Sequence, residues 1–415
     1  MKWGIVVGAV ALIGIWTPVA PAQAGASTRS YVVMVKDGLD PADAATAAGV
    51  APTEVWGAVG GFAADLTNQQ VNRLRADPAV GSVELEGVFA SIPKSSSTRI
   101  DQPAQLVKAA IRRVGGLESP TAKIDGIDDR IKVDIAVLDG GIDRHHPDLN
   151  VAGGFNCVGG KKQDWDDRDG HGTMVGGFAA AIDNSIGVVG IAPGARLWGI
   201  RVADPDGNIT DAALLCGLNW VIEHADKIEV ANMSLSGDDN DVAPCGTSAA
   251  SAIHEAVCKM VKHGVTAVAA AGNQSMDAAT VTPAAYPEVI AVSAMADFDG
   301  QPGGLAAFPT VCHLEGAPEQ LDDHFAWFSN FGAPVDIAAP GVCVTSTYPS
   351  GQYAFSNGTS FSTPLVAGAA ALYISTHPNA TPASVRDALV ARAEPGPISG
   401  DPDPYAEGVL NIRGL

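Results

Sequence analysis

Beyond about residue 130, short apolar segments typical of buried strands alternate with longer helical segments. The strand candidates are residues 133–138, 197–202, 229–233, 265–270 and 289–292. The helical candidates are residues 171–182, 211–224, 248–263, 359–375 and 382–392. This alternation predicts an α/β fold, a doubly wound and mostly parallel sheet flanked by helices. In such sheets, chemistry takes place beyond the carboxyl ends of the strands.

The first 100 residues follow a different plan. Residues 31–36, 61–66 and 80–88 favour strands, and residues 40–48 favour a short helix. A second helix is expected to begin at Thr67, where the spacing to Gln70 is that of a capping box. This pattern predicts a small α+β module of ferredoxin-like type over residues 28–92. The Ser-rich stretch that follows is expected to form an exposed linker that contains the processing site, assigned to residues 93–104.

The chain begins with the features of a secretory leader. Lys2 precedes an apolar run over residues 5–15, and Ala22-Gln23-Ala24 matches a signal peptidase site. The run is too short for a typical transmembrane helix. Residues 1–24 are therefore predicted to be a signal peptide, and the product to be secreted, with no membrane partner after cleavage.

The formal net charge of −21 limits the classes of partner. An acidic surface repels nucleic acid and anionic membranes, so neither is expected to bind. The six cysteines all follow the leader, and an even number in an exported chain indicates three disulfides. Spacing alone leaves 15 pairings open. A metal site made of cysteines is disfavoured because the chain has no Cys-x-x-Cys pair.

Four polar residues stand at positions suited to catalysis. Asp139 and Asn273 each follow a predicted strand, and His171 and Ser360 each stand at the start of a predicted helix. A lone serine there is most often a helix cap, and a lone histidine is most often structural. As a set they offer a nucleophile, a base, a carboxylate that orients the base and an amide that can stabilise an oxyanion.

The segments around these residues resemble the subtilisin-like serine proteases. The resemblance rests on the motifs Val137-Leu138-Asp139-Gly140-Gly141-Ile142, Gly170-His171-Gly172-Thr173, Ala271-Gly272-Asn273 and Gly358-Thr359-Ser360-Phe361-Ser362-Thr363-Pro364. They occur in the chain order Asp, His, Ser that subtilisin has. The resemblance covers residues 105–415, assigned to the catalytic domain. The module over residues 28–92 resembles the family's propeptide inhibitor.

The resemblance implies a serine endopeptidase that is made as a zymogen and processes itself. His171 would take the proton of Ser360, Asp139 would orient His171, and Asn273 would bind the oxyanion. Polypeptides are the expected substrates and the propeptide the expected intramolecular inhibitor of a monomer. The residues implied to contact substrate are Gly207, Ser234, Leu235, Ser236, Ala271 and Gly272.

The resemblance also implies structural Ca²⁺, with the number of sites left open, and no other cofactor. Its ligands would be Gln105, Asp148, Ile182, Asn184, Ile186 and Val188, with Gln102 as an alternative to Gln105. These residues offer the carboxylate, amide and carbonyl oxygens that suit a hard cation. The implied disulfides are Cys157–Cys216, Cys245–Cys258 and Cys312–Cys343.

One departure from the family pattern lies beside the implied triad. The family usually has Thr or Ser after the catalytic aspartate, whereas this chain has Gly140. Two other functions stay open from the sequence. One is a subtilase-fold protein that binds peptides with little or no catalysis, and the other is a processing protease of narrow specificity.

Overall fold

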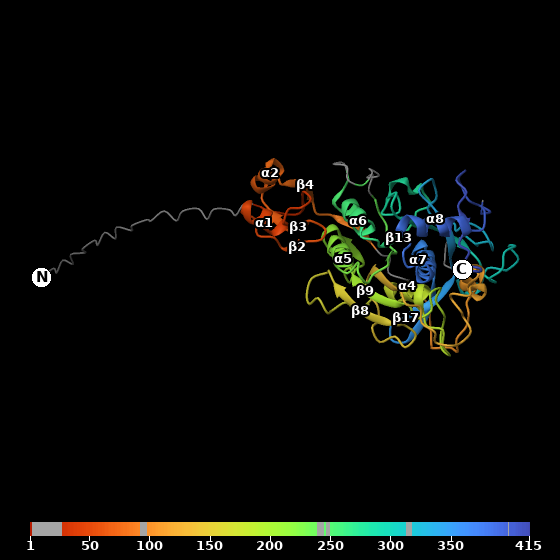
Figure 1. The fold of residues 1–415 in the computed structure, drawn as a ribbon. Helices are drawn as coiled ribbons and strands as arrows, with labels where there is room; N and C mark the ends of the chain where they lie inside the picture. The colour runs from red at the N-terminus through yellow and green to blue at the C-terminus, as the bar shows by residue number, and fades with distance from the viewer. Residues whose placement is uncertain (2–26, 92–97, 239–244, 246–249, 313–317, 397) are drawn as a thin grey trace.

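The computed structural model describes residues 1, 27–91, 98–238, 245, 250–312, 318–396 and 398–415. Residues 2–24 of the predicted signal peptide, residues 93–97 of the predicted linker and the first two residues of the helix predicted from residue 248 therefore lie outside the described residues. Figure 1 shows a large α/β body with a smaller unit packed against one side of it.

An eight-stranded sheet forms the centre of the large body, and every pair of neighbouring strands in it is parallel. This confirms the predicted fold class. In sheet order the strands are β19 (Gly408–Val409), β16 (Ile337–Val342), β15 (Ile290–Ala296), β13 (Thr266–Ala270), β11 (Val230–Met233), β7 (Asp134–Asp139), β9 (Arg196–Arg201) and β8 (Val151–Asn156).

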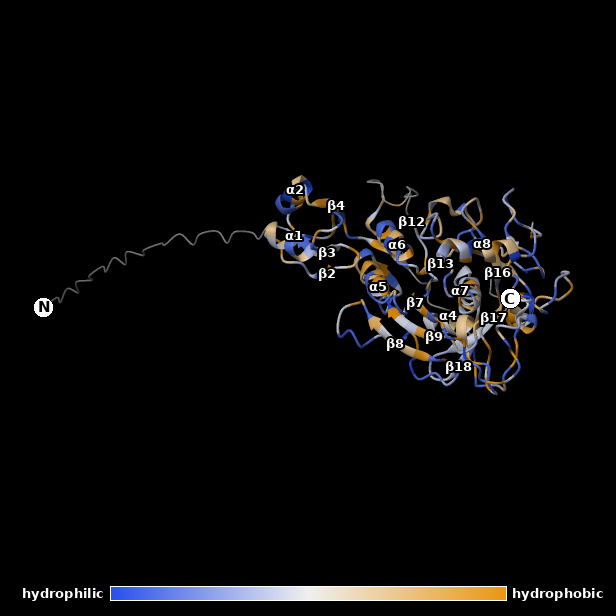
Figure 2. Cartoon of the chain, viewed as in Figure 1, coloured by the Kyte–Doolittle hydropathy of each residue, from blue (hydrophilic) through white to orange (hydrophobic). Residues whose placement is uncertain are grey.

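Helices cover both faces of this sheet (Figures 1 and 2). On one face, α4 (His171–Ala180), α7 (Thr359–Thr376) and α8 (Pro382–Arg392) share one apolar core with the strands. On the other, α5 (Asp211–Glu223) and α6 (Ala252–Lys262) share a second core. Helix α7 can be central because small residues bring it close to its neighbours. A Cβ on Gly368 would lie 2.9 Å from the carbonyl oxygen of Ala179 in α4.

Three strands of the sheet were missed because their sequences have weak strand propensity. Strand β8 contains the pair Gly153-Gly154, and β16 contains Pro340 and Gly341. Glycine has no side chain to pack in a strand, and proline lacks an N–H for the ladder. Strand β19 has only two residues. Tertiary packing, rather than local preference, brings these segments into the sheet.

The N-terminal unit has the ferredoxin-like strand order β2-β3-β1-β4, as predicted. Its two helices follow β1 and β3, and both the Thr67 hydroxyl and the Gln70 side chain complete the predicted capping box. The elements are β1 (Arg29–Val35), α1 (Pro41–Ala47), β2 (Glu54–Trp56), β3 (Gly61–Leu66), α2 (Asn68–Ala76) and β4 (Val80–Leu85).

The sheet of the N-terminal unit packs on helices α5 and α6. Val32, Met34 and Trp56 belong to the same apolar core as these helices. The Asn219 side chain of α5 accepts hydrogen bonds from two backbone N–H groups of the unit, and Lys259 of α6 donates to the Val59 carbonyl at 2.7 Å. The contact therefore combines buried apolar area with specific polar contacts.

The prediction of one strand over residues 80–88 was wrong. The chain leaves β4 at Leu85, and β5 (Val88–Ser91) joins a second sheet between β10 (Asn208–Thr210) and β12 (Gly237–Asp238), with β14 (Val281–Thr282) beyond β12. The Gly87 N–H donates to the Asp211 carboxylate at 2.7 Å, at the start of α5. This contact with another part of the chain was not visible from local sequence.

The described part of the predicted linker is more regular than expected. Its residues 98–100 form β6 (Thr98–Ile100), which pairs with β18 (Gln352–Ser356) of the hairpin that begins at β17 (Val344–Tyr348). The remaining helical segments are short: α3 (Ala109–Arg113) and three 3₁₀ turns, Gly116–Glu118, Ala278–Thr280 and Thr310–Cys312.

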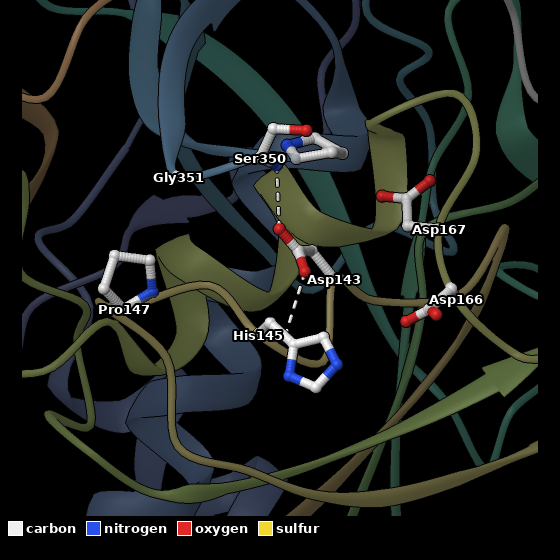
Figure 3. A pocket seen from close by; sticks show the side chains of 8 residues that line it. Asp143, His145, Pro147, Asp166, Asp167, Ser350 and Gly351 are labelled. Atoms are coloured by element: carbon white, nitrogen blue, oxygen red, sulfur yellow. Dashed lines mark hydrogen bonds between the residues drawn. The ribbon is translucent and has the colours of Figure 1, made fainter.

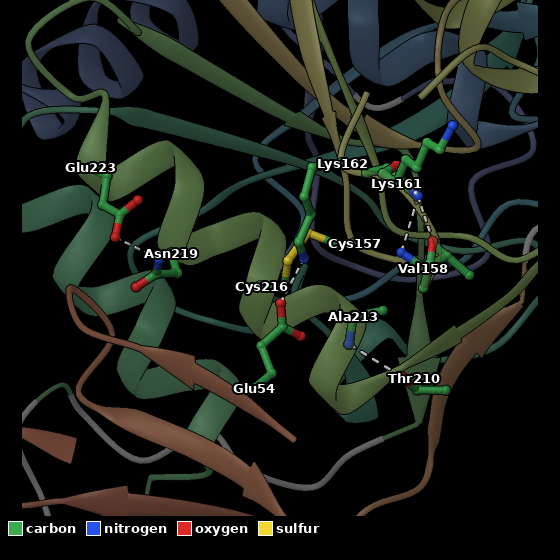
Figure 4. Close-up of a disulfide and its surroundings, with 12 residues drawn as sticks. Glu54, Cys157, Val158, Lys161, Lys162, Thr210, Ala213, Cys216, Asn219 and Glu223 are labelled. Atoms are coloured by element: carbon green, nitrogen blue, oxygen red, sulfur yellow. Dashed lines mark hydrogen bonds and ion pairs between the residues drawn. A yellow bond between two sulfur atoms is a disulfide. The ribbon is translucent and has the colours of Figure 1, made fainter. Parts of the chain in front are cut away.

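The structure contains the three disulfides Cys157–Cys216, Cys245–Cys258 and Cys312–Cys343. Figure 4 shows the first of them linking α5 to the chain just beyond β8. The Thr282–Pro283 peptide bond is cis. Among the described residues, no helix has both the length and the apolar character needed to cross a membrane.

Candidate active site

Asp139 and His171 form a buried ion pair at the carboxyl end of the central sheet. Asp139 is the last residue of β7, and His171 is the first residue of α4. The His171 Nδ1 lies 2.9 Å from Oδ2 and 3.0 Å from Oδ1 of Asp139. Asp139 is fully buried, and its Oδ1 also accepts the Gly140 N–H at 2.7 Å. This geometry holds the imidazole in one orientation.

Two further carboxylates fix the loop that leads into His171. The Asp167 side chain accepts the N–H groups of Gly170 and Thr173 at 2.9 and 2.8 Å. The Asp169 Oδ1 accepts the His171 N–H at 2.7 Å. These bonds satisfy N–H groups at the start of α4 that have no partner within the helix. Neither residue was identified from the sequence, although both stand just before the Gly-His-Gly motif.

The same carboxylates affect the proton affinity of the imidazole. Burial alone would lower the pKa of His171, but the negative charges of Asp139, Asp169 and Asp167 outweigh it and raise the pKa above its usual value. His171 accepts a proton only when it is neutral. Its activity as a base should therefore require a higher pH than an isolated histidine would.

Gly140, which stands where the family usually has Thr or Ser, lies close to the Asp169 carboxylate. A Cβ on Gly140 would lie 3.1 Å from the Asp169 Oδ2. A side chain at position 140 would therefore press on the Asp169 carboxylate. Gly140 leaves space for this second carboxylate beside the Asp139–His171 pair.

Ser360 lies in the first turn of α7, which the polar residues after β11 hold in place. The Ser234 hydroxyl donates to the Ser360 carbonyl at 2.7 Å, and the Ser360 hydroxyl lies 3.3 Å from the Ser234 carbonyl oxygen. The His171 ring packs on Phe361, with 5.4 Å between ring centroids. The residue that follows Ser360 is therefore packed on the imidazole, while the Ser360 Oγ is directed to the Ser234 carbonyl.

Asn273 is oriented by the residue that precedes Ser360. Its Oδ1 accepts both the N–H and the hydroxyl of Thr359, each at 2.9 Å. The Asn273 Nδ2 lies near Gly358, 3.7 Å from where a Cβ on that residue would lie. The arrangement presents an N–H donor on the same side as the start of α7, as an oxyanion donor requires.

The loop that carries Asn273 is supported by Asn330, which the sequence reasoning missed. Asn330 is fully buried, its Nδ2 donates to the Ala271 carbonyl at 2.8 Å, and its N–H donates to the Gly272 carbonyl at 3.0 Å. Its Oδ1 accepts the N–H groups of Gln274 and Met276. The sequence signal that could have identified it is a polar Asn in the segment Ser329-Asn330-Phe331-Gly332, which precedes β16.

The predicted substrate residues lie in the segments next to β10, β11, β12 and β13. Ser234, Leu235 and Ser236 lead from β11 to β12, while Ala271 and Gly272 follow β13. Gly207 comes just before β10, with a φ of 89° that favours glycine. Strand β5 is antiparallel to both β10 and β12, with Ala90 opposite Ile209 and Gly237. The N-terminal unit thus places an extended strand among these residues.

The residues predicted to bind Ca²⁺ also lie together. The Asp148 carboxylate accepts the Val188 N–H at 3.0 Å and the Asn184 amide at 2.8 Å, and the Gln105 side chain accepts the Asn184 N–H. Burial raises the pKa of Asp148 to about 7. Within the described part of the chain, no hydrogen bond reaches the carbonyl oxygens of Ile182 or Ile186. Gln102 is exposed, so Gln105 is the better candidate of the two.

An acidic pocket of about 430 Å³ lies beside the loop before α4 (Figure 3). Asp143 on its wall accepts the N–H groups of His145 and Ser350 at 2.9 and 2.8 Å. Asp166 forms an ion pair with Arg144, and Asp167 accepts the Gly170 N–H at the N-terminus of α4. The acidic side chains of this pocket are thus engaged in holding loops together.

A family model described as the subtilase family matches residues 130–409. The chain belongs to the subtilase family. As a subtilase it is a serine endopeptidase, and the family relation rests on a match that includes Asp139, His171, Asn273 and Ser360.

Curated subtilases are similar over most of the chain. Subtilisin NAT of Bacillus subtilis subsp. natto is 35% identical over 358 residues, covering 86% of this chain and 80% of the relative. Subtilisin of Bacillus pumilus is 38% identical over 68% of this chain and 90% of the relative. The alkaline protease of Shouchella clausii is 34% identical over 84% of this chain and 77% of the relative. The two longer matches exceed the 280 residues that the family model spans.

Proposed function

We propose that this subtilase is a secreted endopeptidase that cleaves polypeptides with Ser360 as nucleophile, His171 as base and Asp139 as its orienting carboxylate. The observation that carries the proposal is the Asp139–His171 pair at the carboxyl end of a parallel sheet, with the imidazole packed on Phe361, the residue after Ser360. In the structure the Ser360 hydroxyl lies 3.3 Å from the Ser234 carbonyl oxygen, and we expect it to turn to the imidazole when substrate binds. Catalytic hydrogen bonds are often absent until substrate binds.

Each step of acyl transfer then has a residue in this chain. His171 takes the Ser360 proton as the oxygen attacks the peptide carbonyl, and Asp139 stabilises the imidazolium. The Asn273 amide and the Ser360 N–H donate to the oxyanion. His171 gives its proton to the leaving amine, and water then releases the acyl group from Ser360.

We further propose that residues 28–92 are a propeptide that inhibits the enzyme until it is cleaved. The position of β5 supports this, because it lies between β10 and β12 as an extended substrate would. The leader motif and the disulfides support export.

We also propose that Gln105, Asp148, Asn184 and the nearby carbonyl groups hold a structural Ca²⁺. The donor set consists of hard oxygens, and the buried Asp148 carboxylate forms no ion pair among the described residues. A bound cation would offset the cost of burying that charge and would fix the loop that ends α4.

Labelling with a fluorophosphonate probe tests whether the protein is a working protease or only a peptide-binding relative. The processed protein is expected to be labelled at Ser360, and prior denaturation should abolish the labelling. A folded, processed protein that stays unlabelled at Ser360 would favour the binding function instead.

Replacing Asn273 by leucine is expected to lower kcat by about 10²–10³-fold, the range known for this donor in subtilisin. The amide contributes mainly when charge develops on the substrate oxygen, so KM should change little. Steady-state kinetics on a peptide substrate would measure both constants. An unchanged kcat with a raised KM would show that Asn273 binds substrate instead.

Replacing Asp169 by asparagine is expected to move the acid limb of the kcat/KM pH profile to lower pH. Asp169 raises the pKa of His171, so removing its charge lowers that pKa and leaves the imidazole neutral at lower pH. Asparagine can still accept the His171 N–H, so the loop should hold. An acid limb that stays in place, or moves to higher pH, would contradict this interpretation.

A further inference from the structure

Strand β5 points toward Ser360 with its carboxyl end. It is antiparallel to β12, with Ala90 opposite Gly237. The segment that precedes β12 leads back to Ser234, whose carbonyl oxygen lies 3.3 Å from the Ser360 Oγ. Because antiparallel strands run in opposite directions, β5 runs from its pairing with β12 toward Ser234. The N-terminal unit thus directs the chain toward the nucleophile.

Strand β6 has the opposite relation to Ser360. It is antiparallel to β18, with Thr98 opposite Phe355. Strand β18 ends one residue later, at Ser356, and Ser360 stands four residues beyond that end. The amino end of β6 is therefore the end that faces the start of α7, and its carboxyl end points away from it.

Together, β5 and β6 have the direction of a peptide that lies across the active site. The chain arrives at the carboxyl end of β5 and continues from the amino end of β6, while residues 92–97 between them lie outside the described residues. An extended peptide bound in this way adds a strand on each side of the bond that is cut. Strand β5 would then lie on the acyl side of that bond and β6 on the leaving-group side.

Arg99 is the residue that connects β6 to the loop of the catalytic histidine. Its guanidinium carbon lies 4.9 Å from the centroid of the Tyr348 ring, and its Nη2 donates to the Tyr348 hydroxyl at 3.3 Å. The Tyr348 hydroxyl in turn donates to the Asp169 carbonyl at 2.8 Å. A Cβ on Gly170 would lie 2.1 Å from the Tyr348 Cε2, so the ring lies against the residue just before His171.

Tyr348 is well placed to hold an exposed cation. Its side chain is fixed by these contacts, and the residue is only 6% exposed. Arg99 is exposed, and within the described residues it forms no ion pair with a carboxylate. A guanidinium is attracted to the π face of an aromatic ring. The position of Arg99 is therefore tied to the same loop that positions His171.

We propose that Tyr348 and the free edge of β18 bind the leaving-group side of the processing segment, and that Arg99 is the positioning residue that holds it there during self-cleavage. The inference rests on the proposed self-processing. The chemistry is the acyl transfer described above, with the new N-terminal amine as the leaving group. A bond held on both sides lies in a reactive orientation more often than a bond held by β5 alone, so Arg99 accelerates cleavage without touching the reacting atoms.

The position of the cut is the first test. Mass spectrometry of both fragments, collected when cleavage has just begun, should place the cut between Ser91 and Thr98. A first cut beyond Thr98 would overturn the proposal, because Arg99 would then lie at the cut itself or on its acyl side.

The rate of self-cleavage is the second test. Pulse-chase labelling of the secreted full chain gives the half-time of processing. Arg99→Ala should lengthen it by about tenfold, whereas Arg99→Lys, which keeps a cation over the ring, should lengthen it by about threefold or less. Arg130→Ala is the matched control, because Arg130 is an exposed arginine that pairs with Asp128, and it should process at the wild-type rate.

Wild-type processing in Arg99→Ala would overturn the proposal, and so would an Arg99→Lys variant as slow as the alanine variant. Tyr348→Leu tests the partner. If Arg99 acts through Tyr348, adding Arg99→Ala to Tyr348→Leu should slow processing no further, and a full additional tenfold loss would contradict the assignment.

Ser360→Ala separates this inference from the function on which it rests. If Ser360→Ala were processed as fast as the wild type, self-processing would be wrong and the anchor would fall with it. If Ser360→Ala stays unprocessed while Arg99→Ala keeps the wild-type half-time, the protease function stands and only the role of Arg99 is disproved.

Discussion

The Ser360→Ala variant is expected to leave the cell with its N-terminal unit still attached, and to lose peptide hydrolysis by about 10⁶-fold. This is the size of effect known for the nucleophile of subtilisin. Alanine removes the attacking oxygen and its long hydrogen bond to the Ser234 carbonyl, but it keeps the shorter bond from the Ser234 hydroxyl to the Ser360 carbonyl, which holds the first turn of α7. N-terminal sequencing of the secreted products would show whether the wild type alone is cleaved.

The matched control for this experiment is Ser362→Ala. Ser362 lies in the same turn, is fully buried, and donates to the Ala339 carbonyl at 2.9 Å. Its loss should cost about 1 kcal/mol of stability but leave processing intact. If Ser360→Ala were processed in the absence of any other protease, self-cleavage by Ser360 would be disproved.

Replacing Asp139 by asparagine is expected to lower kcat by about 10⁴-fold while the protein stays folded. The amide has the shape of the carboxylate, but it can donate to the His171 Nδ1 and so favour the tautomer that cannot accept the Ser360 proton. It also removes the charge that stabilises the imidazolium. Kinetics on processed enzyme, produced by supplying wild-type protease in trans, would give the loss.

Asp143→Asn is the control that separates the loss of a nearby negative charge from the loss of the hydrogen bond to His171. Asp143 accepts two backbone N–H groups beside the same region, but it does not contact His171. This variant should keep nearly wild-type kcat. If kcat fell equally in the two variants, Asp139 would act through the negative charge that it adds to this region, and not through its hydrogen bond to the imidazole.

The sequence predicted the parts of the fold whose local pattern agrees with their environment. Helix α8 begins and ends where its pattern predicts, and α4, α5 and α7 differ by at most two residues at their ends. Strands such as β7 were found because they are buried on both faces and read as continuous apolar runs. Strands β8 and β16 were not, because glycine and proline interrupt them and the neighbouring strands impose their conformation.

The candidate site shows the same division. Asp139, His171, Asn273 and Ser360 stand in motifs whose order along the chain carries information. The roles of the residues that orient them cannot be predicted in this way, even for a residue within a motif, because these roles depend on contacts across the fold. Thr359 is recognisable only once its hydrogen bonds to Asn273 are known, and the role of Asp169 depends on its distance from Gly140.

The position of β5 has a consequence for the kind of protein this enzyme can digest. The gap between β10 and β12 is one strand wide, so only a fully extended segment can enter and complete the ladder. A segment inside a stable helix or sheet of a native protein must first separate from its own partners. The rate at which a folded protein is degraded should then follow how often it opens locally, whatever side chains it presents.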